Sequence, residues 1–330
     1  MKFQKLEFKE LIENNLNKFS ISDTYLCLDY INYLIEYNSV NTYEDLSFIL
    51  EHRDTKIFCP LTLQENKGMK ELNFFGRPFS LGRDNIDNNC IEEAIKILKN
   101  IISEKEIYKI DLLINKGTLP NEYLSTLNKD SISKISHQKF IQLDNNINEI
   151  KAKFSKGHRY LVNREFENLK YKIIDHNNYN GEIYKMMELH VQVSGKITRS
   201  EKSWALNEKM ILNKKGFLIS ANYAEKIISF SFFFHNNGLG EYFSSCTDRN
   251  YFKQFNNITH KSIFLAIQYL KNNNCKYLTL GETKNLYSEK VLSDKEKNIH
   301  IFKNSFGGEC FTNVHFNKIH DDIINTYAYN

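Results

Sequence analysis

Residues suited to binding a polar ligand gather in the segment LHVQVSGKITRSEKSW, which runs from Leu189 to Trp204. His190 falls on the apolar side of a predicted helix that ends near Gly195. The loop that follows carries Arg199, whose guanidinium can fork onto a phosphate or a carboxylate. Trp204 offers a ring that can stack on a sugar or a base. The alternative for His190 is a core histidine with satisfied hydrogen bonds. We interpret the segment as one wall of a binding site.

Three charged residues follow or lie within predicted strands, where acid–base chemistry is often placed. Asp248 ends one strand and can orient or deprotonate an amine; its alternative is a capping aspartate paired with Arg249. Glu282 follows a glycine at the end of another strand, where ligands commonly bind in α/β folds; its alternative is a solvated loop carboxylate. Lys303 lies in a predicted aromatic strand and can neutralise an anion; its alternative is a lysine snorkelling from a sheet edge.

The elements predicted for the first half begin with amphipathic helices over residues 1–50. Two antiparallel strands follow, at 55–64 and 70–82, then a helix at 91–105 and a strand at 107–114. The polar segment 115–155 is the predicted junction. It separates an N-terminal domain, residues 1–148, from a C-terminal domain, residues 149–330, which carries the predicted site.

The second half repeats this order of elements. Helices are predicted at 181–196 and 203–213, and three antiparallel strands at 216–225, 226–238 and 239–247. A helix over 258–274 then leads to a strand at 275–282. A strand, a helix and a strand in this order predict a parallel pair with a right-handed crossover. We interpret the two halves as a degenerate duplication.

That order is the one used by the GNAT acyltransferase fold, and particular residues resemble one branch of it. The segment IFKNSFGGECF, Ile301–Phe311, resembles the closing motif of the FemAB and FemX peptidyltransferases, in which a strand with a Phe-Lys pair, here Phe302 and Lys303, runs into a Phe-Gly-Gly turn. Shorter segments, YLTLGE, KGHRYLVNREFENLKYKI and LNFFGRPFSLG, resemble other parts of the family in the same order. The resemblance implies an α/β (α+β) fold of two GNAT-like domains, each a mixed, mostly antiparallel sheet flanked by helices.

The activity that the resemblance implies is N-acyl transfer to an amine, an amino sugar or a peptide amine of a cell-envelope or surface-polysaccharide precursor. In the GNAT fold the parallel strands splay apart and expose backbone N–H groups to a carbonyl. The splay would include Tyr242 to Asp248 on one strand and Glu282 on the other. The Gly-Gly pair at 307–308 is interpreted as a backbone requirement.

The donor implied is either an acyl-CoA or an aminoacyl-tRNA. GNAT enzymes bind the CoA pyrophosphate with a glycine-rich loop at a helix start, but the corresponding segment, 244–262, contains no glycine. FemAB-like proteins also lack that loop, and many take an aminoacyl group from tRNA. A non-catalytic module that binds a nucleotide or a glycan remains a second alternative.

A basic cluster at the start of the second half is the predicted contact for tRNA or a sugar-nucleotide diphosphate. It includes Arg159; the alternative is a solvated helix start. With 44 Lys and Arg against 40 Asp and Glu, the formal net charge is +4, which permits a phosphate-bearing partner without requiring one. The six cysteines form no C-x-x-C pair, and the His-Asp-Asp run at 320–322 is too isolated for a metal site. The sequence predicts a cytoplasmic protein with no metal and no membrane span.

Overall fold

The computed structural model describes residues 2–5, 27–52, 55–66, 68–80, 88–115, 132–255, 257–284 and 292–319. The chain packs as two compact units that exchange segments. Unit 1 comprises Met1–Ile21, Asn38–His137 and Phe311–Asn330, and unit 2 comprises Ser22–Tyr37 and Gln138–Cys310. The division predicted at residue 148 follows chain order, whereas the packing does not. Such an exchange leaves no local pattern in a sequence, because it depends on contacts between distant segments.

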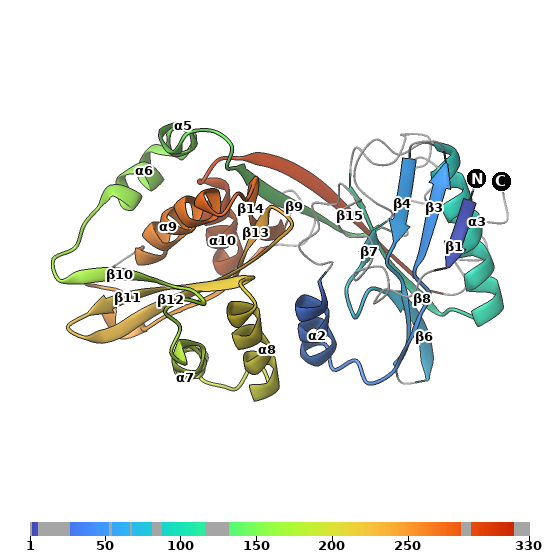
Figure 1. The fold of residues 1–330 in the computed structure, drawn as a ribbon, viewed down its shortest axis with the longest axis horizontal. Helices are drawn as coiled ribbons and strands as arrows, with labels where there is room; N and C mark the ends of the chain where they lie inside the picture. Colours follow the sequence, from blue (N-terminus) through green and yellow to red (C-terminus); the bar gives the residue numbers. More distant parts are fainter. Residues whose placement is uncertain are drawn as a thin grey trace. The chain divides into compact units, whose positions relative to one another are not determined.

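In the described residues of unit 1, two sheets pack with the helix α3 (Asn88–Lys105) (Figure 1). The smaller sheet has the antiparallel order β1 (Lys2–Lys5), β3 (Phe48–His52) and β4 (Thr55–Cys59). In the larger sheet, the order is β15 (Glu309–Ile319), β8 (Lys109–Asn115), β6 (Met69–Asn73), β5 (Thr62–Asn66) and β2 (Tyr43–Asp45), and β7 (Phe79–Ser80) also pairs with β8. Helix α3 leads into β8, which is parallel to β6 and β7.

Two predictions for the first half need correction. Within residues 27–50 only α2 (Leu28–Tyr37) is helical, and β1 and β3 are strands; residues 6–26 lie outside the described part of the chain. The two strands predicted at 55–64 and 70–82 are each divided, which gives the four strands β4, β5, β6 and β7. Pro60, which has no N–H for a sheet ladder, separates β4 from β5. Gly76, with φ +77°, lies in the turn between β6 and β7, where a Cβ would come within 2.9 Å of the Asn38 Cβ.

Unit 2 is built on a mixed sheet, in which the four strands predicted at 216–225, 226–238, 239–247 and 275–282 are confirmed. The strands at 132–142 and 169–174 were not predicted, and the first of them lies within the segment predicted as the junction. The order of the sheet is β10 (Leu169–Ile174), β11 (Gly216–Tyr223), β12 (Lys226–Asn236), β13 (Leu239–Thr247), β14 (Tyr277–Lys284) and β9 (Ile132–Gln142). Strands β10 to β13 are antiparallel, and β13 and β14 are parallel. The helix between the last two is α9 (Ile258–Asn272), as predicted.

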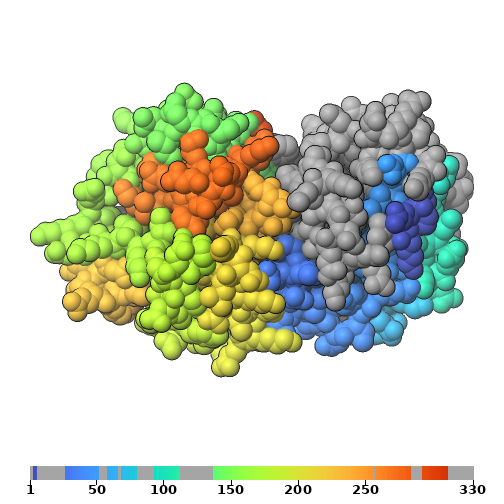
Figure 2. Space-filling model, in the orientation of Figure 1, coloured from blue at the N-terminus to red at the C-terminus, as the bar shows by residue number. Residues whose placement is uncertain are grey.

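Helices cover both faces of this sheet (Figure 1). One face carries α6 (Lys156–Asn163) and α9, and the other carries α7 (Glu182–Ser194) and α8 (Glu201–Leu212). Figure 2 shows α7 and α8 side by side on the surface of the unit. Helix α2 packs on α8, where Asn213 donates to both carboxylate oxygens of Asp29 at 3.0 Å. The remaining helices are α5 (Ile147–Ala152), the short 3₁₀ helix η3 (Arg249–Tyr251) and α10 (Asp294–Asn304).

The core of unit 2 is rich in aromatic side chains. Phe217 stacks on Phe233 with 5.0 Å between ring centroids, and both side chains are fully buried. Helix α9 lies close to the sheet because Gly240 has no side chain: a Cβ there would come within 2.4 Å of Leu270 Cδ1. This glycine therefore serves helix packing, and Gly238, with φ +78°, forms the hairpin turn predicted between β12 and β13.

Candidate functional site

The parallel strands β13 and β14 pair at one end and diverge at the other. Their register covers Leu239–Glu241 on β13 and Tyr277–Thr279 on β14, although both strands continue, to Thr247 and Lys284. In β13 a bulge coincides with the divergence, because Tyr242 pairs with Phe233 and Ser244 with Phe232, leaving Phe243 as the extra residue. Bulges bend a strand and increase its twist. The predicted splay is thus present, and it begins after Glu241.

In β14 the corresponding irregularity is Gly281. Its φ of +75° is in the left-handed region, which residues with a side chain rarely adopt. The Gly281 N–H donates to the Thr279 hydroxyl at 3.1 Å, and that hydroxyl also accepts from the Gln138 amide at 3.0 Å. Thr279 and Gln138 are buried. The backbone at the divergence is therefore held by polar contacts within unit 2.

Lys303 reaches this point from α10. Its ammonium donates to the Glu282 carbonyl oxygen at 2.9 Å and lies 3.3 Å from the position that a Cβ on Gly281 would take. Burial lowers the pKa of Lys303, and the nearby carboxylates of Glu241 and Glu282 oppose that shift. The site thus brings one partly desolvated cation beside two acidic residues, each supplied by a different element.

The placement of Lys303 corrects the prediction of a strand at Phe302 and Lys303, because both lie in the last turn of α10. The helix begins at Ser293, whose hydroxyl accepts from the Glu296 N–H while the Glu296 carboxylate accepts from the Ser293 N–H. This capping box has the spacing Ser-x-x-Glu, a readable sign of a helix start. The aromatic motif that follows favoured a strand instead, so this helix was not predicted.

Glu241 is the residue that sequence reasoning missed. It lies inside β13 with 8% of its surface exposed, one residue before the predicted Tyr242. A glutamate in the apolar strand segment LGEYF is a usable signal, because carboxylates are rarely buried without a specific role.

Tyr242 and Phe302 support the site from the α9 side of the sheet. The Tyr242 hydroxyl donates to Ser245, and burial raises the pKa of Tyr242 to about 12. Phe302 packs edge-on against His260 and Phe306, at centroid distances of 4.9 and 5.3 Å. Because Phe302 precedes Lys303 directly, this packing positions α10, and with it the ammonium group.

Asp248 caps η3, which was the alternative to the catalytic role considered from the sequence. Its carboxylate accepts from the Asn250 N–H at 3.1 Å at the start of η3 and from Lys226 at 3.0 Å. Burial by itself would raise the pKa of Asp248, but these hydrogen bonds lower it below the ordinary value. The predicted pairing with Arg249 is replaced by Lys226, which faces it from the neighbouring strand β12.

His190, Arg199 and Trp204 do come together. The Arg199 guanidinium lies 5.0 Å from the Trp204 ring centroid, and the His190 ring meets Trp204 at 5.7 Å. His190 Nδ1 lies 3.3 Å from the Thr198 hydroxyl. Burial, and then the charge of Arg199, lowers the pKa of His190, which favours a neutral imidazole.

The role predicted for Trp204 does not fit its burial. The side chain is 1% exposed, so it offers no free face to a ligand. Tyr37 is 47% exposed and lies 5.8 Å from the Arg199 guanidinium, so it has the accessible ring. Among the described residues, no group bonds to the buried Nη1 of Arg199, which suits this guanidinium to an anion.

Arg159 and the loop after β13 complete the predicted positions. The Arg159 guanidinium donates to the carbonyls of Ala152 and Phe154, at 2.9 and 2.5 Å, which is a structural role at the end of α5. In the glycine-free loop, η3 follows β13 directly and Phe255 is buried against Ala221 and Ile228. Side chains therefore fill the region where a glycine-rich loop would expose its N–H groups.

In the described residues, no group of three His, Cys, Asp or Glu side chains is placed to hold a metal ion. Likewise, none of the helices within those ranges is long and apolar enough to cross a bilayer.

The chain resembles tandem GNAT proteins in its fold. No protein-family model and no curated protein matches the sequence. Among solved structures, FemX aligns over 98% of this chain and 99% of its own, with a TM-score of 0.65 and 9% identity. A tandem GNAT protein from the clavulanic acid biosynthesis pathway aligns over 97% and 98%, with a TM-score of 0.53 and 7% identity. A conserved protein of unknown function from Bacteroides thetaiotaomicron aligns over 95% and 99%, with a TM-score of 0.53 and 10% identity.

These alignments confirm the predicted fold class and the FemX-like arrangement. Because they extend over nearly the whole chain, they cover both units.

Proposed function

We propose that the protein is a transferase of the GNAT and FemAB type that moves an acyl group onto an amine. The proposed acceptor is an amino sugar or peptide amine of a cell-envelope or surface-polysaccharide precursor, and the proposed location is the cytoplasm. The observation that carries the proposal is the divergence of β13 and β14, with Lys303 at its mouth. The FemX-like fold supports it.

Acyl transfer needs hydrogen-bond donors for the oxyanion of its transition state, and the divergence would supply them. The amine attacks the carbonyl carbon of the donor, and the charge that develops on its oxygen requires hydrogen-bond donors. Backbone N–H groups that face the gap between β13 and β14, together with the Lys303 ammonium, would fill this role. The C–N bond forms as the C–S or C–O bond to the donor breaks.

A carboxylate near Lys303 would take the proton from the attacking amine and return it to the leaving thiolate or alkoxide. Glu241 and Glu282 are the two candidates, since both act electrostatically on Lys303. Asp248 is a weaker one, because hydrogen bonds to Asn250 and Lys226 already occupy its carboxylate.

The acceptor would bind on the α7–α8 side of unit 2. Arg199 and Tyr37 offer a guanidinium and an exposed ring for an anionic group attached to a sugar or peptide. His190, held neutral, would line the same wall.

The donor favoured by one observation is an aminoacyl-tRNA. The loop between β13 and α9 is filled by η3 and Phe255, and a side chain at every position hinders the close backbone approach that a pyrophosphate needs. Acyl-CoA is the other donor, and its binding would require this loop to rearrange.

The test is to measure donor binding and turnover on the same protein. Acetyl-CoA and a charged tRNA pool would be titrated separately by calorimetry and filter retention, with uncharged tRNA as the control. We expect saturable binding that prefers charged tRNA. Saturable binding of acetyl-CoA alone would contradict the donor assignment and keep the transferase. A binding module would be favoured by two results together. The wild-type protein would transfer nothing to amino-sugar or peptide amines, and the Glu241→Gln and Glu282→Gln variants would still bind the donor.

A further inference from the structure

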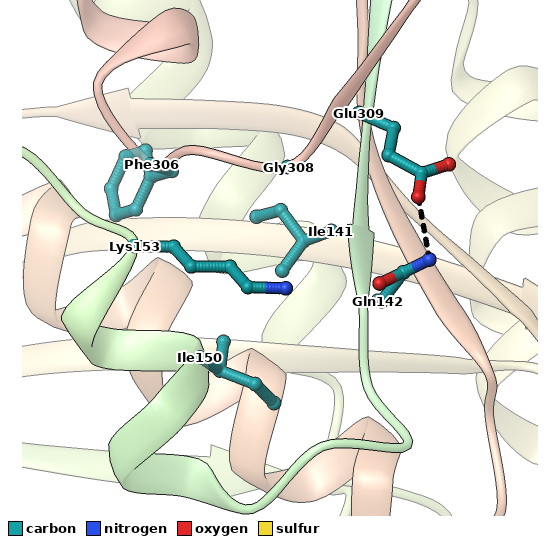
Figure 3. A pocket seen from close by; sticks show the side chains of 7 residues that line it. All are labelled: Ile141, Gln142, Ile150, Lys153, Phe306, Gly308 and Glu309. Atoms are coloured by element: carbon teal, nitrogen blue, oxygen red, sulfur yellow. Dashed lines mark hydrogen bonds between the residues drawn. The ribbon is translucent and has the colours of Figure 1, made fainter.

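A cavity of about 140 Å³ lies in unit 2, apart from the diverging strands (Figure 3). It is bordered by the end of β9, by α5, and by the turn that follows α10. Its floor is formed by Ile141, Ile150 and Phe306, all of which belong to the buried core. An engineered cavity of about 150 Å³ that is lined by apolar side chains holds benzene, whereas here apolar side chains supply the floor alone and the cavity is partly open to solvent. The volume is still large enough for a compact apolar group.

One cationic side chain enters this apolar space. Figure 3 shows the Lys153 side chain extending across the cavity, with its ammonium near Ile141 and Ile150. No hydrogen bond or ion pair joins that ammonium to another residue in the described part of the chain. The neighbouring lysine, Lys151, differs because its ammonium donates to Asn163 at 3.1 Å. Lys153 thus brings an available positive charge to the edge of an apolar floor.

The opposite rim carries a polar pair. The Gln142 amide donates to the Glu309 carboxylate at 2.7 Å, and both residues line the cavity. This hydrogen bond leaves the second oxygen of Glu309 for another donor. A ligand that spans the cavity would therefore meet a cation at one side and a carboxylate at the other.

The cavity walls are fixed by the Gly-Gly turn. Gly307 and Gly308 have φ values of +70° and +84°. A Cβ would lie 2.6 Å from the Lys153 carbonyl oxygen at Gly307, and 2.4 Å from the Phe140 carbonyl oxygen at Gly308. The turn is thus pressed against both α5 and β9, as the predicted backbone requirement implied. Such a wall preserves the shape of the cavity in the absence of a ligand.

From these features we propose that the cavity binds a small carboxylate that bears a compact aliphatic group. The carboxylate would pair with Lys153, and the aliphatic group would cover the floor formed by Ile141, Ile150 and Phe306. A free aliphatic amino acid and a short branched fatty acid share this chemistry. Glu309 would distinguish these two ligands, because it would face the ammonium group of the amino acid, and the fatty acid has no such group.

The experiment uses the full-length chain and requires no turnover, so its outcome is independent of the proposed transferase activity. L-leucine, its isostere 4-methylpentanoate and L-leucinamide would be titrated by calorimetry and by thermal shift, up to about 10 mM, since a single small site is expected near the millimolar range. We expect leucine and 4-methylpentanoate to bind and raise the melting temperature, and leucinamide, which lacks the carboxylate, to do neither. If leucine binds more tightly, Glu309 pairs with the ammonium group of the ligand. If 4-methylpentanoate binds more tightly, Glu309 repels the ligand and makes no such pair.

Lys153→Met is the decisive variant, because it keeps the aliphatic stem and removes the charge. It should weaken binding about tenfold or more, as expected for a charge-assisted contact. Lys156→Met, at an exposed lysine that does not line the cavity, is the matched control and should bind like wild type. The proposal is overturned when neither carboxylate binds, or when Lys153→Met binds as tightly as wild type.

Discussion

Asp248 follows the last residue of β13, and Lys303 contacts the diverging part of β14 at Glu282, yet the surroundings of the two residues differ. Asp248 is bonded by groups of its own neighbourhood, the Asn250 N–H and the Lys226 ammonium, and is 1% exposed. Lys303 comes from a separate helix, contacts one backbone carbonyl and stands near two acidic residues. A charged side chain whose bonding capacity is filled serves structure, whereas one brought from elsewhere and only partly satisfied is available for chemistry.

The largest effect is expected from Lys303→Met. Removal of a charge that stabilises the developing oxyanion should lower kcat by about 10²- to 10³-fold, as for other oxyanion-hole groups. Substrate binding and the circular dichroism spectrum should change little. Steady-state transfer kinetics with the donor that the binding test selects would measure the loss, and Lys297→Met, in the exposed first half of α10, is the control. An equal loss in both variants would contradict the role of Lys303.

The next effect concerns the histidines beneath Lys303. His158 and His260 meet with 4.3 Å between ring centroids and pack on Phe302. Burial, and then the neighbouring His158, lowers the pKa of His260 to about 4; burial also lowers the pKa of His158. The unfolded chain, with an ordinary pKa near 6.5, therefore binds more protons than the folded chain between these values.

Stability should consequently be complete above pH 6.5 and decline as the pH falls toward 4. Each pH unit carries 1.36 kcal/mol, so His260 accounts for at most about 3 kcal/mol over this interval. Urea unfolding at pH 7 and pH 4.5 would measure the difference. In His260→Phe the acid sensitivity should shrink, and an unchanged pH dependence would show that other groups cause it. Because Phe302 precedes Lys303, transferase activity in wild type should decline over the same interval.

The smallest effect is expected at Asp248. Asp248→Ala removes the η3 cap and the partner of an exposed lysine, and should lower the free energy of unfolding by about 1 kcal/mol. Asp248→Asn keeps the cap and should lose less. Chemical denaturation would rank the three proteins, and kcat should stay within a few-fold of wild type in both variants. A loss of kcat comparable with that of Lys303→Met would reverse the comparison between the two residues.

Local patterns in the sequence were sufficient for most of unit 2. Helices α7, α8 and α9 and strands β11 to β14 follow their predicted ranges closely. The helices have an apolar face with a clear period, and the strands are short runs rich in β-branched and aromatic residues between turns. The splay was predicted from the resemblance to GNAT proteins, and it occurs where expected. In the first half, the pattern before residue 50 was misleading, because short strands such as β3 carry the same apolar residues as a helix.

The order of most elements, the glycine turns and the residue types available for chemistry could be read from the sequence. Which of those residues meet depends on three-dimensional packing. Glu241 lies in β13 and Lys303 in α10, with η3, α9 and β14 between them along the chain, and they approach because α10 packs beside β14. Trp204 and Asp248, chosen for their chemistry, became core and cap residues because their neighbours bury them. The burial of a residue and its distance from other residues depend on contacts between segments far apart in the chain, so a single stretch of sequence does not predict them.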